Sequence, residues 1–507
     1  MNHASQSDNR LTNVAAGLAE DPPLPLSSLP PAGVCSLHQV PSPESGPQRW
    51  AALSVAGRMR VLRAARERLA ERALEFPEAI SPHLARSKSD TLTTELLPLL
   101  AGCRFLERNA ARILSPQRLG RSGRPVWLTG LAAEILRVPL GHVLVIGPSH
   151  FPLYIPGSQV LQALAAGNRV TWKPGVGGKA VALLVALALA DAGLPEGTLT
   201  VTEESVAAAE EALATHPDKV VFTGSSRTGH HLLRMLAEGA IPAVMELSGA
   251  DAIIVTPSAD LQEVAKAVAF GLRLNGASVC MSPRRLFATP TTMAALRPLL
   301  DAALATVPAV ALEPGTAQRL GALLDEAVSQ GAMLRGALEP QAQRPLLVDR
   351  ASARMTVARS DLFAPVISLM EAESMLHVPG LYAECAYGLT AAIFCDRKQE
   401  KMARLLGGML NAGSLLINDI IVPTADPRVP FGGRGESGYG VTRGAEGLLE
   451  MTAVKTMLVQ RGGVKLHLNA PRSLDAEAYA GLVQVLYGRG LGPRWAGLKR
   501  LLGKMRS

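Results

Sequence analysis

Two residues of this sequence, a cysteine and a glutamate, stand in settings where a side chain can do chemistry. Cys280 lies in NGASVCMSPRR, after a glycine-containing turn and close in sequence to two arginines. A thiolate in a positively charged setting is a nucleophile, although a cysteine is more often a buried structural residue. Glu246 lies in the apolar run AVMELSGADAIIV, where a carboxylate is costly to bury unless it is functional or paired with an arginine. Each residue alone leaves both interpretations open.

A second group of residues could bind a phosphate. Gly224, Ser225 and Gly229 lie in FTGSSRTGHHLL, between the end of an expected strand and the start of an expected helix. Free N–H groups and the helix dipole favour an anion there, and glycines let it approach. The alternative is a plain strand-to-helix turn that Ser225 caps. Lys173 ends another strand and could reach the same ligand, or it could be a solvated strand end.

The segment GPSHFPLY places His150 just after the apolar run Val143–Ile146. Histidine can donate or accept a hydrogen bond near neutral pH, so it suits an active site. The alternative is a polar residue in a tight turn between Pro148 and Pro152.

Composition limits the class of protein. The chain has 507 residues, more than one hydrophobic core normally serves, so we expect two or three domains. The longest apolar stretch, from Ala180 to Ala190, is too short to span a bilayer and indicates a buried helix. No secretory signal is visible, which makes the cytoplasm the expected location. The five cysteines are scattered and lack zinc-type pairing, which indicates reduced thiols and no metal site.

Alternating helices and short apolar strands must position these residues. After an N-terminal arm without periodicity, leucines recur helically from Trp50 to about Leu114, including Leu62, Leu69 and Leu74. Residues 126–141 indicate a hairpin or a pair of strands. Further strands are expected at 142–147, 168–174, 197–202, 219–225, 251–256, 284–289, 364–370, 389–395 and 414–419. Strands that alternate with helices predict parallel sheets, here in two α/β lobes.

The order of the motifs is more specific than any one of them. VPLGHVLVIGPSHFP, LAAGNRVTWKP, GLPEGTLTV, HPDKVVFTGSSRTG, MELSGADAIIV, NGASVC, DLFAPVISLM, YGLTAAIF, GSLLIND and VPFGGRGESGYG follow one another. In this order they resemble the aldehyde dehydrogenase superfamily from about Trp50 to about Lys455, as a divergent member. The resemblance implies two doubly wound α/β lobes, a Rossmann-like cofactor lobe and a catalytic lobe, with a small β element for oligomerisation. The expected division is a disordered arm at 1–45, a cofactor lobe at 46–123 and 141–246, oligomerisation strands at 124–140 and 452–462, a catalytic lobe at 247–451 and a basic extension at 463–507.

The resemblance also implies roles for residues. Cys280 would be the nucleophile that attacks an aldehyde, and Glu246 the base that activates water to hydrolyse the resulting thioester. NAD or NADP would be the cofactor, and the protein a homodimer or homotetramer. The expected cofactor contacts are Pro148, Lys173, Gly224, Ser225, Gly229, Asp361 and Phe363.

Four positions depart from the family pattern. Val176 stands where NAD-preferring relatives commonly carry a glutamate, which leaves the choice between NAD and NADP open. Asp361 replaces a glutamate that grips the nicotinamide ribose, and Ser278 replaces a glutamine before the nucleophile. His150 replaces an asparagine whose amide helps to hold the oxyanion, so His150 would have to supply that N–H or serve only the turn.

The C-terminal end departs in charge. Residues 487–507 contain six Arg or Lys and no acid, with Trp495, Leu498, Leu501, Leu502 and Met505 at helical spacing. This pattern is typical of an interfacial helix on an anionic membrane, with a packed helix or a disordered basic tail as alternatives. A peripheral membrane protein would favour long-chain or lipophilic aldehydes as substrates.

Other classes of function can be weighed against these patterns. The sequence lacks aromatic residues interleaved with the basic ones and lacks a basic stripe elsewhere, which argues against nucleic-acid binding. Because His150, Asp361 and Ser278 depart from the family pattern, a second hypothesis stays open: the protein could be a weakly active or inactive family member that binds nucleotide or acts as a scaffold, or one that binds the membrane surface through its basic tail.

Overall fold

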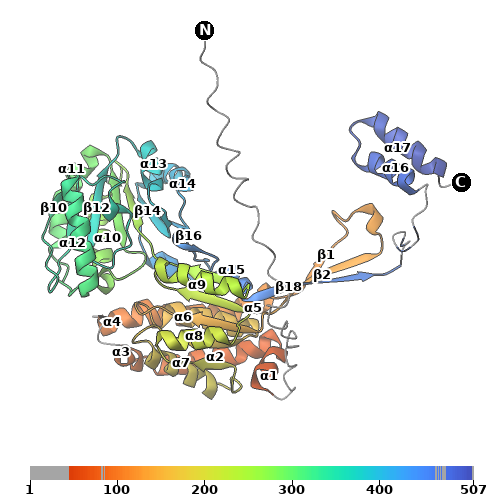
Figure 1. Ribbon diagram of the computed structural model, residues 1–507, viewed down its shortest axis with the longest axis horizontal. Coiled ribbons are helices and arrows are strands. Elements are labelled where there is room, and N and C mark those ends of the chain that lie inside the picture. Colours follow the sequence, from red (N-terminus) through yellow and green to blue (C-terminus); the bar gives the residue numbers. More distant parts are fainter. Residues whose placement is uncertain are drawn as a thin grey trace, which may run out of the picture. The chain divides into compact units, whose positions relative to one another are not determined.

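The structure is a computed structural model that describes residues 45–80, 84, 86–462, 465, 468, 470 and 475–504. The predicted N-terminal arm lies outside the described residues except for Ser45, and so do Met505 to Ser507 of the predicted tail. The chain divides into two compact units (Figure 1): the larger runs to Leu114 and continues at Val138–Ala453, and the smaller contains Ser115–Arg137 and Val454–Ser507. Within the described part of the chain, no helix is both long and apolar enough to cross a membrane.

The first sheet of the larger unit has six strands in the order β17-β7-β6-β3-β4-β5. Its strands are β3 (His142–Ile146), β4 (Arg169–Lys173), β5 (Leu199–Val201), β6 (Lys219–Thr223), β7 (Ala243–Glu246) and β17 (Gly438–Tyr439). All neighbours are parallel except β17, which is antiparallel to β7. The accompanying helices are α1 (Gly46–Ala52), α2 (Val55–Glu71), α3 (Glu75–Ala79), α4 (Lys88–Thr91), α5 (Leu97–Ile113), α6 (Tyr154–Ala166), α7 (Lys179–Asp191), α8 (Val206–Ala214), α9 (Ser226–Glu238) and α15 (Gly444–Glu450), with a π-helical turn η2 (Leu92–Leu96).

Strand β3 is where the order of the strands reverses. It lies between β4 and β6, so Ile146 is in register with Lys173 on one side and Phe222 on the other. In open α/β sheets, ligands bind outside the carboxyl ends of the strands at such a reversal. The loops that carry His150 and Ser225 begin at this edge.

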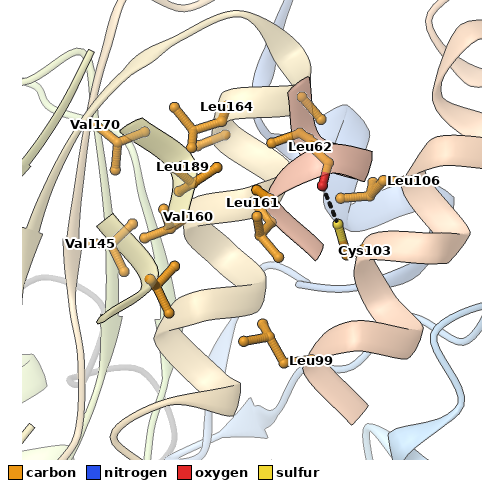
Figure 2. Packing of buried hydrophobic residues seen from close by; sticks show 14 of the residues in the cluster. Leu62, Leu99, Cys103, Leu106, Val145, Val160, Leu161, Leu164, Val170 and Leu189 are labelled. Carbon is orange, nitrogen blue, oxygen red and sulfur yellow. Dashed lines mark hydrogen bonds between the residues drawn. The ribbon is translucent and has the colours of Figure 1, made fainter. Parts of the chain in front are cut away.

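A close-packed core fixes this sheet against its helices. Side chains from α2, α5, α6 and α7 meet those of β3 and β4, including Leu62, Leu99, Leu161 and Val145 (Figure 2). Cys103 is fully buried there and donates its thiol hydrogen to the carbonyl of Leu62 at 3.4 Å. Complete burial of an aliphatic side chain contributes about 1.5 to 3 kcal/mol, so this cluster holds the sheet edge rigidly.

Two helix predictions need correction. Leu74 is exposed, because α2 ends at Glu71 and Leu74 begins the next short helix instead of continuing the apolar face. Helix α7, which covers the stretch predicted to be buried, packs only one side on the core. Its other side leaves Leu183 and Leu187 in solvent.

The second sheet of the larger unit has seven strands in the order β10-β11-β12-β9-β8-β14-β15. They are β8 (Asp251–Val255), β9 (Pro283–Ala288), β10 (Met333–Arg335), β11 (Leu346–Asp349), β12 (Val366–Glu371), β14 (Thr390–Phe394) and β15 (Ser414–Ile417). Only β10 is antiparallel to its neighbour. Its helices are α10 (Leu261–Arg273), α11 (Pro290–Leu304), α12 (Pro314–Ser329), α13 (Val378–Ala383) and α14 (Glu400–Gly408), with the 3-10 turns η4 (Leu274–Ala277), η5 (Thr356–Arg359), η6 (Met375–His377), η7 (Arg397–Gln399) and η8 (Val422–Ala425). A two-stranded sheet pairs β13 (Tyr387–Gly388) with β16 (Arg434–Gly435). Two doubly wound, mostly parallel sheets are the fold class that the sequence predicts.

The smaller unit contains a three-stranded sheet and two helices. The sheet has the order β1-β2-β18, from β1 (Gln117–Leu119), β2 (Leu131–Pro139) and β18 (Thr452–Gln460). The predicted hairpin at 126–141 is one strand, because a 3-10 turn η3 (Val126–Leu128) and Gly130 with φ +81° precede β2. Residues 115–123, assigned from the sequence to the cofactor lobe, belong to this unit. The two helices are α16 (Asp475–Tyr487) and α17 (Leu491–Lys504).

Candidate active site

Cys280 and Glu246 line the same pocket of the larger unit. Glu246 is the last residue of β7, and Cys280 lies between η4 and β9. The pocket has an empty volume of about 860 Å³, including space open to solvent. Most of its wall is apolar, with contributions from Phe151, Tyr154, Phe270, Leu274, Leu389 and Phe431. The structure therefore brings the predicted nucleophile and the predicted base, which are far apart in the sequence, into one apolar cavity.

An unusual backbone turn positions Cys280. Asn275, Gly276 and Ala277 have φ values of 55°, 61° and 59°, a run of three residues in the left-handed region. Such a conformation is costly for Asn and Ala and persists only where the surroundings enforce it. The side-chain amide of Asn275 donates to the backbone carbonyl of His150 at 2.8 Å. The turn before the cysteine is thereby tied to the GPSH loop after β3.

The two arginines near Cys280 in the sequence serve the backbone. Arg284 donates to the carbonyl of Ala277, and Arg285 donates to the carbonyl of Ala250 at 2.8 Å. Burial raises the pKa of the Cys280 thiol to about 12, and the charges of Asp251 and Glu246 add to this effect. Without a base or a bound ligand, the cysteine is therefore protonated at neutral pH.

Three polar side chains hold the carboxylate of Glu246. Thr442 donates its hydroxyl hydrogen to Oε1, and Thr223 donates to Oε2 at 3.2 Å. The amide of Gln159 also donates to Oε2 at 3.3 Å. Burial raises the pKa of Glu246, while the charge of Arg443 and the two threonine hydroxyls lower it. Glu246 is 4% exposed and paired with neutral donors, so it is not the salt-bridged carboxylate of the structural alternative.

Arg443 is the cation of this pocket that the sequence analysis did not identify. Its Nη1 donates to the Tyr154 hydroxyl at 2.9 Å and to the Thr424 carbonyl at 2.7 Å. Its guanidinium lies over the Phe431 ring at 4.2 Å. It lowers the pKa of Cys280 as well as that of Glu246. Thr442 and Arg443 lie two and three residues after the end of the motif VPFGGRGESGYG, and this position is the signal that could have identified them.

His150 lies between two aromatic rings. Its ring centroid is 5.7 Å from that of Phe151 and 5.6 Å from that of Phe363. It does not line the pocket of Cys280 and Glu246. Nε2 is buried and has no hydrogen-bond partner among the residues that the structure describes. Burial together with the charge of Arg86 lowers the pKa of His150 to about 4. The imidazole is therefore neutral at physiological pH, with an unsatisfied buried nitrogen.

The predicted cofactor residues lie at the carboxyl edge of the six-stranded sheet. Lys173 ends β4 and is 9% exposed, and burial lowers its pKa. Helix α9 starts after β6, and its N-cap Ser225 accepts from the N–H of Thr228 at 3.2 Å. Lys173 and the N-terminus of α9 lie at the ends of strands on the two sides of β3, at the edge where the strand order reverses. A cation and free N–H groups at such an edge are a donor set that suits a dinucleotide.

The glycines of this region are required for packing. A Cβ on Gly229 would lie 2.5 Å from Cδ2 of Leu247, and one on Gly224 would lie 2.4 Å from the Phe222 ring. Pro148 is approached just as closely, because a Cβ on Gly175 would lie 2.4 Å from its carbonyl oxygen. These contacts pack α9 against the chain after β7, and the loop after β4 against the loop after β3.

A carboxylate that the sequence analysis missed stands beside Val176. Glu204 accepts the backbone N–H of Gly177 at 2.9 Å and that of Lys179 at 2.7 Å. It thus occupies the N-terminus of α7, and its charge raises the pKa of Lys173 against the effect of burial. Val176 leaves its own position without a carboxylate. Glu204, which follows β5, places one at the same loop.

Asp361 and Phe363 are the two residues predicted to contact the nicotinamide end of the cofactor. Asp361 accepts from Arg319 at 3.1 Å, so this carboxylate already has an ionic partner. Phe363 is partly exposed and contacts the His150 ring. Within the described residues, no group of three or more His, Cys, Asp and Glu could hold a metal ion.

A cysteine and a carboxylate in one pocket, in a unit with a doubly wound sheet, are an arrangement typical of cofactor-dependent oxidoreductases. A sequence model described as "Aldehyde dehydrogenase family" matches residues 39–457, and the chain belongs to this family. It is an NAD(P)-dependent enzyme that oxidises an aldehyde.

Three similar proteins illustrate the relationship. The 4,4'-diapolycopene aldehyde oxidase of Methylomonas sp is 28% identical over 455 residues, or 87% of this chain and 84% of that protein. Vanillin dehydrogenase of Pseudomonas fluorescens is 30% identical, over 82% of this chain and 87% of its own. The solved structure of NADP-dependent glyceraldehyde-3-phosphate dehydrogenase from Bacillus halodurans C-125, complexed with NADP, is 26% identical with a TM-score of 0.73, and covers 82% of this chain and 89% of its own.

Proposed function

We propose that Cys280 is the nucleophile and Glu246 the general base of aldehyde oxidation to a carboxylate. The observation that carries this proposal is that both residues line one apolar pocket. Arg443 shares that pocket and lowers the pKa of both groups. A buried carboxylate with a raised pKa suits a base that must accept a proton near neutral pH.

The proposed reaction has two halves. The Cys280 thiol gives its proton to Glu246, the sulfur forms a bond to the aldehyde carbon, and the carbonyl electron pair moves to oxygen. Bound NAD(P)⁺ supplies the acceptor for the hydride that leaves this carbon when the C=O bond forms again. The product of this half is a thioester on Cys280. Water then attacks the thioester while Glu246, having released its first proton to solvent, takes a proton from that water. Finally, the carbon–sulfur bond breaks with its electron pair going to sulfur, which takes the proton from Glu246 and becomes the thiol again. The carboxylic acid leaves and loses its proton to solvent, which gives the carboxylate.

The oxyanion needs donors in both halves. We propose that a neutral His150 turns toward the pocket and offers an N–H when substrate and cofactor are bound. It does not line the pocket in this structure, but its Nε2 has no hydrogen-bond partner among the described residues. Removal of one oxyanion donor typically lowers kcat by about 10²- to 10³-fold, so the loss of the His150 N–H should be visible in kcat.

We further propose that the substrate is a long-chain or otherwise lipophilic aldehyde. The support is the largely apolar wall of the pocket, to which phenylalanine, leucine and isoleucine side chains contribute. One similar protein is named 4,4'-diapolycopene aldehyde oxidase. Burial of each additional methylene contributes about 0.8 kcal/mol, so kcat/KM should rise up to about fourfold per methylene until the pocket is filled.

The test is the formation of reduced nicotinamide, followed by absorbance, with straight-chain aldehydes of increasing length. We expect kcat/KM to rise with chain length with NAD or NADP, and to be lost in Cys280→Ser. A kcat/KM that falls with chain length would contradict the lipophilic substrate. An absence of activity on all aldehydes, with Cys280 unreactive toward iodoacetamide, would favour the nucleotide-binding or scaffold hypothesis.

A further inference from the structure

The two C-terminal helices pack on each other through glycines. A Cβ on Gly481 of α16 would lie 2.8 Å from the carbonyl oxygen of Gly497 on α17, and the reverse distance is 2.6 Å. Small residues let two helix backbones approach closely, so the crossing needs no large apolar side chain. In the hairpin, which is α16 and α17 together (Figure 1), the two backbones therefore approach closely at these glycines. Some of its larger apolar side chains stay exposed and can contact another surface.

These larger residues form a stripe on α17. Leu491, Trp495, Leu498 and Leu502 follow the spacing i, i+4, i+7 and i+11, which places them on one face of a helix. Leu491, Trp495 and Leu502 are 85%, 60% and 53% exposed. A globular protein seldom leaves such a row of large apolar side chains in water unless it meets another apolar phase.

Basic residues border the stripe. By helical geometry Arg494 lies on one side of it and Lys499 on the other, and both are exposed. The ammonium group of Lys499 lies 5.8 Å from the Trp495 ring centroid. Long basic side chains with an aromatic ring between them match the level of lipid headgroups, where cations meet phosphates and the ring sits at the boundary.

We propose that the hairpin lies on the surface of an anionic lipid bilayer, with the stripe of α17 in the acyl boundary. Charge decides between this occupant and a second copy of the chain. Residues 487–507 carry six cations and no acid, and α16 adds only the two acids Asp475 and Glu477, so the hairpin with its tail is net positive. Two such hairpins repel each other, whereas anionic lipid attracts them. The helix has 14 residues, which suits an interfacial position and not a spanning one. The stripe and its charge lie outside the segment that the family model matches.

The test is sedimentation of the full-length protein with phosphatidylcholine vesicles, with and without 30% phosphatidylglycerol. We expect binding to the anionic vesicles only, weakened in high salt because the headgroup attraction is screened. The combined substitution Leu491→Gln, Trp495→Gln and Leu502→Gln should lower the partition coefficient by about tenfold or more. The charge variant Arg494→Gln and Lys499→Gln should lower it by about 25-fold, since each basic residue is worth about 1 kcal/mol, or about fivefold.

A matched control removes equally exposed apolar residues elsewhere. The control is the combined substitution Leu376→Gln, Met402→Gln and Leu405→Gln, at exposed positions of the larger unit. It should leave vesicle binding unchanged. Activity on a water-soluble aldehyde should be the same in all variants, which separates membrane docking from the reaction. Equal sedimentation of the parent and the stripe variant would overturn the proposal. So would a stripe variant that changes molar mass in light scattering without lipid, because the stripe would then be a contact between subunits.

Discussion

Thr442 donates its hydroxyl hydrogen to Oε1 of Glu246, although the two residues are 196 positions apart in the sequence. This bond stabilises the ionised carboxylate and lowers its pKa against the effect of burial. Thr442→Val should therefore raise the pKa of Glu246 by about one unit, as expected for a hydrogen bond to a charged group. Because the base must be ionised to act, the acidic limb of the kcat profile should move to higher pH.

The matched control for this variant is Thr356→Val. Thr356 also donates its hydroxyl hydrogen to a glutamate, Glu326, at 2.8 Å, but it lies outside the pocket. Its pH profile should overlay that of the parent protein. An acidic limb that does not move in Thr442→Val would show that this hydroxyl does not tune the base.

Arg443 lowers the pKa of both Cys280 and Glu246, so its removal should weaken the nucleophile. In Arg443→Gln, a rise of one unit in the thiol pKa reduces the thiolate fraction about tenfold at pH 8. The rate of Cys280 alkylation by iodoacetamide, followed by mass spectrometry, should fall by this factor. Arg404→Gln removes an exposed arginine paired with Glu400 and should leave the rate unchanged. An equal rate in both variants would contradict the electrostatic role of Arg443.

His150 should matter for kcat more than for KM. His150→Ala removes the proposed oxyanion N–H and should lower kcat by about 10²-fold, while His150→Asn supplies an amide and should stay within about tenfold of the parent. Steady-state kinetics on both variants measures this difference. If His150→Ala turns over like the parent, the ring serves only the loop between the two prolines.

The same residue makes a separate prediction about stability. The folded pKa of His150 is about 4 against an ordinary value of 6.5, so between these values the unfolded chain binds a proton that the folded chain does not. This term lowers the free energy of unfolding as pH falls from 6.5 to 4, by on the order of 3 kcal/mol. His150→Asn has no group at this position that titrates in this range, so it does not lose this stability. The melting temperature of the variant should therefore rise relative to that of the parent as the pH falls toward 4. A constant difference between the two proteins across this range would disprove the low pKa.

Glu204 should influence the choice between NAD and NADP. Its carboxylate occupies the α7 N-terminus and its charge acts on Lys173, so it would repel the 2′-phosphate of an NADP bound beside Lys173. Glu204→Gln should improve the Kd of NADP relative to that of NAD by about tenfold, in line with one removed charge contact. Calorimetric titration of both cofactors measures this ratio. Glu203→Gln removes a neighbouring exposed carboxylate paired with Lys179 and should leave the ratio unchanged, and the same response in both variants would exclude a specific role for Glu204.

The sequence predicted the elements with strong local patterns and missed those that depend on distant partners. Strand β3 could be predicted because its residues are apolar and its end is marked by Gly147 and Pro148. Strand β17 has two residues and forms only because β7 lies beside it, so no local pattern predicts it. The same applies to the site. Cys280 and Glu246 could be proposed from their motifs, whereas the contacts of Thr442, Arg443 and Glu204 arise from tertiary packing.

The most direct test of the account is to trap the acyl group on the protein. Glu246→Gln keeps the shape of the base but accepts a proton neither from the thiol nor from water. Above about pH 8 the thiol can still lose its proton slowly to solvent base, whereas hydrolysis of the thioester has lost its positioned base. The thioester should therefore form slowly and accumulate when aldehyde and NAD⁺ or NADP⁺ are mixed with this variant. Peptide mass spectrometry after a rapid acid quench should then find Cys280 carrying the aldehyde mass less one hydrogen in place of its thiol hydrogen, with up to one equivalent of reduced nicotinamide formed. Steady turnover without an adduct, or an adduct on Cys103, Cys385 or Cys395 instead, would contradict the central claim.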